Sequence, residues 1–194
     1  MNIELWKKVH ALVTSGRIKE SVGYLEQGLS NCPGPRFKSL IGASFNNDPK
    51  DVALHIKRFV VDCERAFRVK AVYLEMNGFD INPDRWYFDS FAYDSYFEDA
   101  EDLDWLSDWD SGEWPDLTLT GLEKVQDDFA WYTGHKTKGC EDSEAEMASE
   151  FALLLVMCKF TGLIEEAVKT GTIDKGVPIL ATAHDFDIIP RFAA

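Results

Sequence analysis

Apolar residues recur with helical spacing near the start of the chain and predict two helices. Leu5, Val9 and Leu12 fall on one face of the first helix, and a second stripe with the same spacing follows. Residues 31–35 contain two prolines and a glycine, which interrupt both regular structures. The residues before this interruption, 1–30, are too few to form a core of their own. The sequence therefore predicts an N-terminal helical hairpin, residues 1–30, packed on the main body.

The rest of the chain alternates between short apolar runs and longer amphipathic stretches. Apolar runs bounded by turn residues predict four strands, at 37–45, 71–76, 85–93 and 177–183. Capping residues and apolar stripes predict further helices over 48–69, from Thr120 and from Ser143. Only the stretch from Phe37 to Ala71 has the order of a right-handed βαβ crossover. We therefore expect one α+β domain over residues 1–194, with a small mixed or antiparallel sheet of about four strands and about five helices.

Charge and aromatic residues concentrate in one segment, residues 80–116. It contains thirteen acids and one base, Arg85, and so accounts for twelve of the fourteen net negative charges. It also contains ten of the twenty-five aromatic residues. Disordered acidic tracts have few aromatic residues, and protein cores rarely hold unpaired acids. The segment is therefore predicted to be folded, with rings near a strongly negative surface and a long acidic-aromatic loop over 94–115.

Composition also limits the classes of partner. A net charge of −14 and a pI near 4.6 disfavour nucleic acid and anionic membranes, because both require clustered Lys and Arg. The N-terminus lacks an apolar signal core, and the longest apolar run, 151–158, is shorter than the ~20 residues of a membrane-spanning helix. The four cysteines are widely spaced. We expect free thiols and a cytoplasmic location, with no membrane or nucleic-acid partner.

Motifs for catalysis or cofactor binding are weak. The sequence has no P-loop, no dinucleotide-binding glycine pattern and no nucleophile elbow, so no cofactor is expected. The acids after Asp102 resemble a calcium loop, but Gly112 comes one place early and Leu119 occupies the final ligand position, so no metal site is predicted. His184 and Asp185 follow an apolar run, where such a pair can act as a base or a metal ligand. An ordinary turn at the end of a strand is the other interpretation.

These patterns favour a non-enzymatic protein-binding module that engages a basic protein partner through residues 80–116. Tryptophan is favoured at binding hot spots, and complementary charge raises association rates. The expected anchors and charged rim are Trp105, Trp109, Trp114, Asp102, Asp104, Asp108 and Asp110. In acidity and size the chain is similar to acidic inhibitor and immunity proteins that neutralise basic toxins, although no shared motif accompanies that similarity.

Three alternatives stay open. In the first, the rings only hold the long loop against the sheet, and the basic helix over 50–70 neutralises the acids within the chain. In the second, loop carboxylates combine with His184 and Asp185 in a metal-assisted hydrolase. In the third, the aromatic segment is buried in a homodimer, or the protein is a scaffold.

Overall fold

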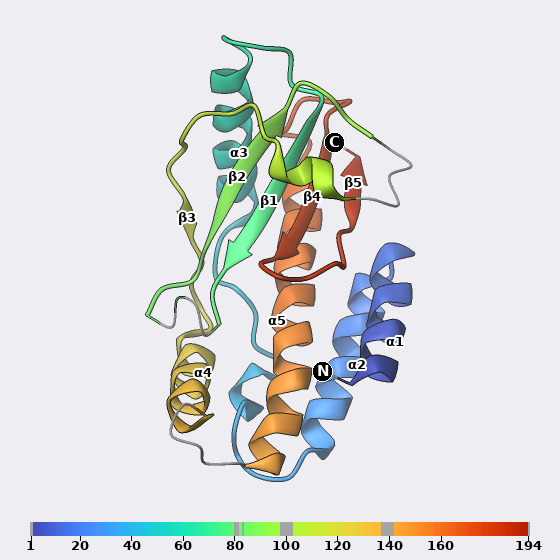
Figure 1. The fold of residues 1–194 in the computed structure, drawn as a ribbon, viewed down its shortest axis with the longest axis vertical. Coiled ribbons are helices and arrows are strands. Elements are labelled where there is room, and N and C mark those ends of the chain that lie inside the picture. Colours follow the sequence, from blue (N-terminus) through green and yellow to red (C-terminus); the bar gives the residue numbers. More distant parts are fainter. Residues whose placement is uncertain (1, 80–81, 83, 98–102, 137–141, 194) are drawn as a thin grey trace.

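Two antiparallel strands predicted from the sequence lie at the middle of the sheet. The computed structural model describes residues 2–79, 82, 84–97, 103–136 and 142–193. Within them, β1 (Ala71–Asn77) pairs antiparallel with β2 (Tyr87–Tyr93) and parallel with β4 (Pro178–Ala183). With the edge strands β3 and β5 the order is β3-β2-β1-β4-β5 (Figure 1). The sheet is mixed, and the predicted α+β class is confirmed.

The edge strands β3 (Leu117–Thr118) and β5 (Arg191–Ala193) were not predicted. They are only two and three residues long, too short for a visible apolar alternation. Their pairing depends on neighbours far away in the sequence, since β3 lies beside β2 and β5 beside β4. Short edge strands limit the row of unpaired backbone groups that a sheet presents to other chains.

The predicted strand at 37–45 is wrong, and with it the βαβ unit that depended on it. Phe37 has a φ of 62°, and a short 3-10 helix, η1 (Lys38–Leu40), follows. The Lys38 amine donates to carbonyl groups near the end of the second helix, including that of Cys32 at 2.7 Å. In the segment 37–45 the side chains of Phe37, Leu40 and Phe45 are buried individually, while Ile41 is exposed, so they do not form one face of a strand.

The N-terminal hairpin is present and packs on the longest helix. Its helices are α1 (Ile3–Thr14) and α2 (Ile18–Asn31), and α2 lies against α5 (Ser143–Lys169). A Cβ atom on Gly28 would lie 2.1 Å from the Phe151 ring, so the absence of a side chain there permits the close contact. By length and composition α5 could cross a membrane, but most of its apolar stretch is buried inside the domain, as in a core helix.

Helix ends follow local capping, with small shifts from the expected positions. Asp48 caps α3 (Pro49–Cys63) by accepting a hydrogen bond from the Lys50 amide. This helix is shorter than the predicted 48–69, because the chain turns after Cys63 to enter β1. Asp142, rather than Ser143, caps α5. The remaining helix, α4, spans Glu123–Lys136.

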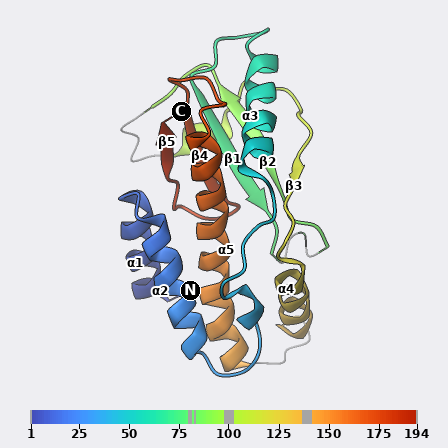
Figure 2. The ribbon, with the colours of Figure 1, turned by 180° about the vertical axis from the view of Figure 1, so that it is seen from behind.

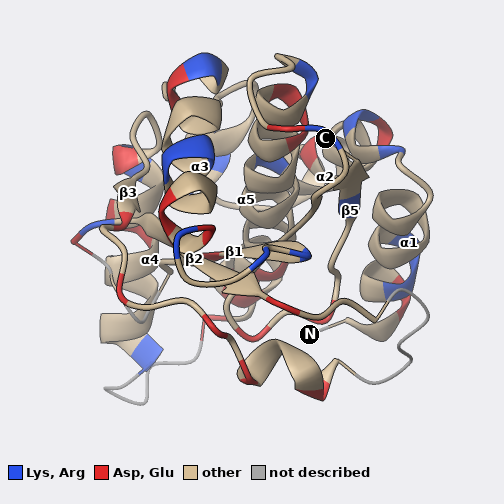
Figure 3. Cartoon of the chain, turned by 90° about the horizontal axis from the view of Figure 1, so that it is seen from above, with Lys and Arg blue, Asp and Glu red and all other residues tan. Residues whose placement is uncertain are grey.

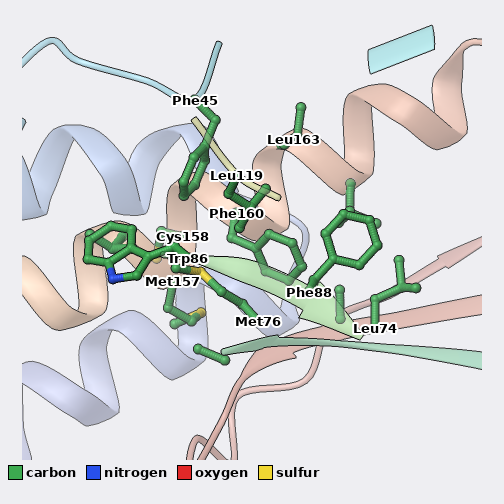
Figure 4. Packing of buried hydrophobic residues seen from close by; sticks show 14 of the residues in the cluster. Phe45, Leu74, Met76, Trp86, Phe88, Leu119, Met157, Cys158, Phe160 and Leu163 are labelled. Atoms are coloured by element: carbon green, nitrogen blue, oxygen red, sulfur yellow. The ribbon is translucent and has the colours of Figure 1, made fainter. Parts of the chain in front are cut away.

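Helices cover one face of the sheet, here called the inner face. Figure 2 shows α3 and α5 in front of the strands when the molecule is seen from behind. Between them and the sheet lie fully buried side chains such as Leu74, Met76, Phe88 and Phe160 (Figure 4). No helix of comparable length covers the opposite, outer face in the described structure; the segment with the 3-10 helix η2 (Asp104–Ser107) crosses it instead (Figure 1).

Candidate protein-binding surface

Side-chain alternation along β1 and β2 makes the outer face aromatic and acidic. In β1 every second residue from Tyr73 points outward, and in β2 the outward residues include Asp89 and Phe91. Glu75 lies directly opposite Asp89, and Tyr73 lies opposite Phe91. Residues directly opposite on an antiparallel pair have neighbouring side chains, so each strand contributes to the same rows of the surface.

The η2 segment is held on this face by Trp105. Its ring packs edge-on against Tyr93, with ring centroids 4.8 Å apart, and the Tyr93 hydroxyl donates to the Leu106 carbonyl at 2.8 Å. Burial and the nearby Glu75 raise the pKa of Tyr93 well above its ordinary value, so the hydroxyl keeps its proton. Trp105 is therefore half-buried within its own chain, where it fixes the loop.

Trp109 is the exposed tryptophan of the outer face. Its side chain is 50% exposed, and its ring lies on Phe91 with centroids 4.8 Å apart. Phe91 in turn stacks on Tyr73 at 5.9 Å. Phe97, which contacts Trp105, is also 55% exposed. Phe91 belongs to β2, so the strand fixes the residue on which the Trp109 ring rests. Trp109 thus presents a large, well-supported ring to solvent.

The predicted acids have different roles. Asp110 accepts a hydrogen bond from the Asp94 amide at 2.8 Å and donates its own amide to the Ala92 carbonyl, so it ties the loop to the end of β2. Asp104 and Asp108 are exposed. Asp102 lies outside the described residues. The structure therefore brings Asp104, Asp108 and Asp110 to the same loop as Trp109.

Trp114 does not join the other two tryptophans. It packs on the helix side of the sheet, 5.6 Å from the Phe59 ring, and its indole donates to Nε2 of His55 at 3.2 Å. This hydrogen bond needs a neutral imidazole. Burial and the nearby Arg58 lower the pKa of His55, which keeps it neutral. Trp105 and Trp114 thus hold the long loop on opposite faces of the sheet, and of these three tryptophans Trp109 is the exposed one.

Among the described residues, α3 forms its ion pairs away from the acidic loop. The ion pairs of α3 join Lys57 to Asp174 at 3.4 Å and Arg65 to Asp62 at 2.7 Å. In the part of the chain that the structure describes, no Lys or Arg of α3 pairs with an acid of residues 84–97 or 103–116. Acids gather along the side of the sheet that carries η2, while α3 and the turn after it carry several bases (Figure 3).

A second row of polar groups on the outer face was not recognised in the sequence. Glu75 accepts hydrogen bonds from the Tyr73 hydroxyl at 2.8 Å and from Nδ1 of His184 at 2.7 Å, and Asn77 donates to Asp89 at 2.7 Å. In the sequence, the alternation of inward and outward side chains within 71–77 and 87–93 could have indicated which residues belong to this row. Only the strand register shows that the two carboxylates lie opposite each other.

These contacts also shift the ionisation of the row. The hydrogen bond to Glu75 raises the pKa of His184, so its ring is charged over a wider range of pH. Burial, followed by the charges of Asp116 and Glu75, raises the pKa of Asp89. Neighbouring carboxylates contribute to both shifts, after burial in the case of Asp89, and such a negative surface favours an added positive charge.

His184 lies just after β4, next to two acidic side chains. Among the described residues, its ion-pair partners are Glu75 of β1 and Asp185 in its own turn, at 2.7 and 3.6 Å. No group of three or more His, Cys, Asp or Glu side chains in the described ranges could hold a metal ion. The described cysteines, Cys32, Cys63 and Cys158, are free and buried.

Comparison with protein-family models, with curated proteins and with solved structures gave no match.

Proposed function

We propose that this protein is a non-enzymatic binding module that engages a basic protein partner through the outer face of its sheet. The observation that carries the proposal is the Trp109 ring, 50% exposed and supported by Phe91, within a loop of exposed acids. A rigidly supported aromatic ring loses little conformational freedom on binding, and such rings are frequent hot spots.

The surrounding charge supports a partner of opposite sign. Asp94, Asp108 and Glu113 are exposed and form no ion pair within the described part of the chain. A surface of one sign steers an oppositely charged partner and raises the association rate. Inhibition of a basic enzyme or toxin, as immunity-type proteins do, is the form of this function that we expect.

The proposed anchors differ from the set suggested by the sequence. Trp105 and Trp114 already pack within the chain, so their loss would act on loop structure before binding. Trp109 and the exposed Phe97 are free to contact a partner directly. The acidic rim consists of Asp94, Asp104 and Asp108, while Asp110 has the structural role described above.

A capture experiment with matched variants tests the proposal. The full chain serves as bait in native lysate at about 0.1 M and about 1 M salt, where the Debye length falls from ~10 Å to ~3 Å. One bait carries Asp94→Asn, Asp104→Asn and Asp108→Asn, and a second carries Trp109→Ala. The control bait carries Glu64→Gln, Asp127→Asn and Glu146→Gln, which remove the same charge at exposed sites just after α3 and on α4 and α5.

The expected result is a basic protein retained by the unaltered and control baits, released by salt and lost from the other two. With the purified partner, Trp109→Ala should weaken binding by ~2 kcal/mol or more, mainly through faster dissociation. The acid variant should slow association and reduce its salt dependence. Equal capture by all four baits would exclude the outer face as the binding surface. A mass that doubles with concentration, and falls on Trp109→Ala, would instead identify a homodimer.

A further inference from the structure

A cavity of about 380 Å³ lies between α2, α5 and the segment 44–49. Most of its wall is apolar, with side chains of Ile18, Val22, Phe45 and Leu163. Phe45 and Leu163 are labelled in Figure 4. Cavities of this size, with apolar walls and few polar groups, are typical of small-molecule sites. None of these residues belongs to the outer face.

A glycine in the middle of α5 keeps this cavity open. Gly162 lies in the wall, and a Cβ atom added there would make only an ordinary contact, 3.6 Å from Cγ2 of Ile18. Gly28 differs, because a Cβ atom there would lie 2.1 Å from Phe151. Glycine weakens a helix relative to alanine. Helix packing explains Gly28 but not Gly162, whose missing side chain instead leaves space in the cavity.

The charged groups of the wall are already paired within the chain. Lys159, whose side chain is 8% exposed, lies 2.7 Å from Glu26 and donates to the Ala43 carbonyl at 2.6 Å. Lys19 pairs with Glu166 at 3.5 Å. The last charged residue of the wall, Glu165, pairs with Lys169 at 2.9 Å. A charged ligand would lose its hydration here without gaining an unpaired partner, which disfavours it.

Polar groups in the wall offer few hydrogen bonds. Cys158 has its thiol next to the Ser21 hydroxyl, which lies 3.2 Å away, and burial raises the pKa of the thiol to about 12. The thiol is therefore protonated and not a nucleophile. Asn47 uses its amide group for hydrogen bonds to Thr118 and Thr120. The exposed Ser44 hydroxyl is the one other uncharged polar side chain of the wall, so shape and apolar contact dominate recognition.

We infer that this cavity binds a small neutral apolar molecule, at a site separate from the outer face. The test uses the full chain and two fluorescent probes with related ring systems, neutral N-phenyl-naphthylamine and anionic anilinonaphthalene sulfonate. The neutral probe should bind with enhanced fluorescence, and at least tenfold more tightly than the sulfonate. Gly162→Leu, which fills the cavity, should weaken the neutral probe at least tenfold.

Gly23→Leu is the matched control, because Gly23 is a helical glycine of α2 with no atom within 4 Å of an added Cβ. It should leave probe binding unchanged. Circular dichroism checks that each variant is folded, and Val22→Phe fills the cavity from α2 if Gly162→Leu does not fold. Equal binding to filled and control variants, no binding to the unaltered chain, or equal affinity for the two probes would overturn the inference.

One further outcome would assign the cavity to another occupant. If the neutral probe fails to bind while Gly162→Leu abolishes capture of the protein partner, the cavity receives an apolar side chain of that partner. That result overturns the small-molecule inference and leaves the proposed partner binding in place. If Trp109→Ala no longer captures the partner but binds the neutral probe normally, the outer face and the cavity are separate sites.

Discussion

The two faces of the β1–β2 pair are built from alternate residues of the same two strands but differ in what they can do. On the inner face Leu74 and Phe88 are fully buried under α3 and α5. One position further along each strand, Glu75 and Asp89 lie on the outer face among aromatic rings and hydrogen-bond partners. The inner face loses water on folding and supplies stability. The outer face keeps charge and exposed rings, which cost stability and are useful for recognition.

The largest expected difference between the faces comes from two phenylalanines of β2. Phe88→Ala removes a fully buried ring packed on Phe160, and it should lower the free energy of unfolding by about 3–5 kcal/mol. Phe91→Ala truncates a half-buried ring on the outer face and should cost only about 1 kcal/mol. Urea unfolding of both variants measures the two losses. Equal losses would show that the outer face is also a stabilising core.

A buried hydroxyl gives a smaller effect on the inner face. The Ser90 hydroxyl is buried without a hydrogen-bond partner among the described residues. Ser90→Ala should therefore raise the free energy of unfolding by about 1 kcal/mol. Ser149→Ala is the control, because that buried hydroxyl donates to the Glu146 carbonyl at 2.7 Å and its loss should destabilise. The same sign of change for both serines would contradict this interpretation of Ser90.

On the outer face, removing a charge should stabilise the fold slightly. Asp89 lies opposite Glu75, so Asp89→Asn should raise the free energy of unfolding by roughly 0.2–1 kcal/mol at neutral pH. The pKa of Asp89 is raised in the folded state, so the gain is present above that raised pKa. It should disappear as the pH falls to the ordinary value for Asp. Asp127→Asn at an exposed site of α4 should show no comparable pH-dependent gain in urea titrations at several pH values.

The smallest expected effect concerns His184. Its hydrogen bond to Glu75 raises its pKa, so Glu75→Gln should lower that pKa toward or below its ordinary value of ~6.5. Because the pKa of His184 is higher in the folded state, the protonated ring stabilises the fold. This contribution is complete at pH values below the ordinary pKa, and it is lost as the pH rises through the folded-state pKa. The ring is 43% exposed, so solvent keeps the contribution below ~1 kcal/mol. Proton NMR titration measures the pKa, with His184→Gln to assign the signal. An unchanged pKa in Glu75→Gln would show that Glu75 is not its cause.

The long loop shows what the spacing of residues in a sequence can and cannot predict. Its acidity and rings predicted a folded segment with rings near its surface, and among the described residues Trp105 and Trp114 pack within the chain. The three tryptophans were expected to act together, but the loop wraps around the edge of the sheet. Rings only a few residues apart therefore lie on different faces. Sequence spacing cannot show this, because the chain from Trp109 to Trp114 has no regular structure whose period would fix where the rings point.

The sequence by itself determined the local features of this protein. Apolar spacing defined the N-terminal hairpin, the strands β1 and β2 and the helix α5, because each pattern acts over a few residues. Only the tertiary structure decided which strands are neighbours and what each face carries. The pairing of Glu75 with Asp89, the contact of His184 with β1 and the cavity beside Gly162 all join distant residues. Such contacts depend on register and helix packing, which no short stretch of sequence contains.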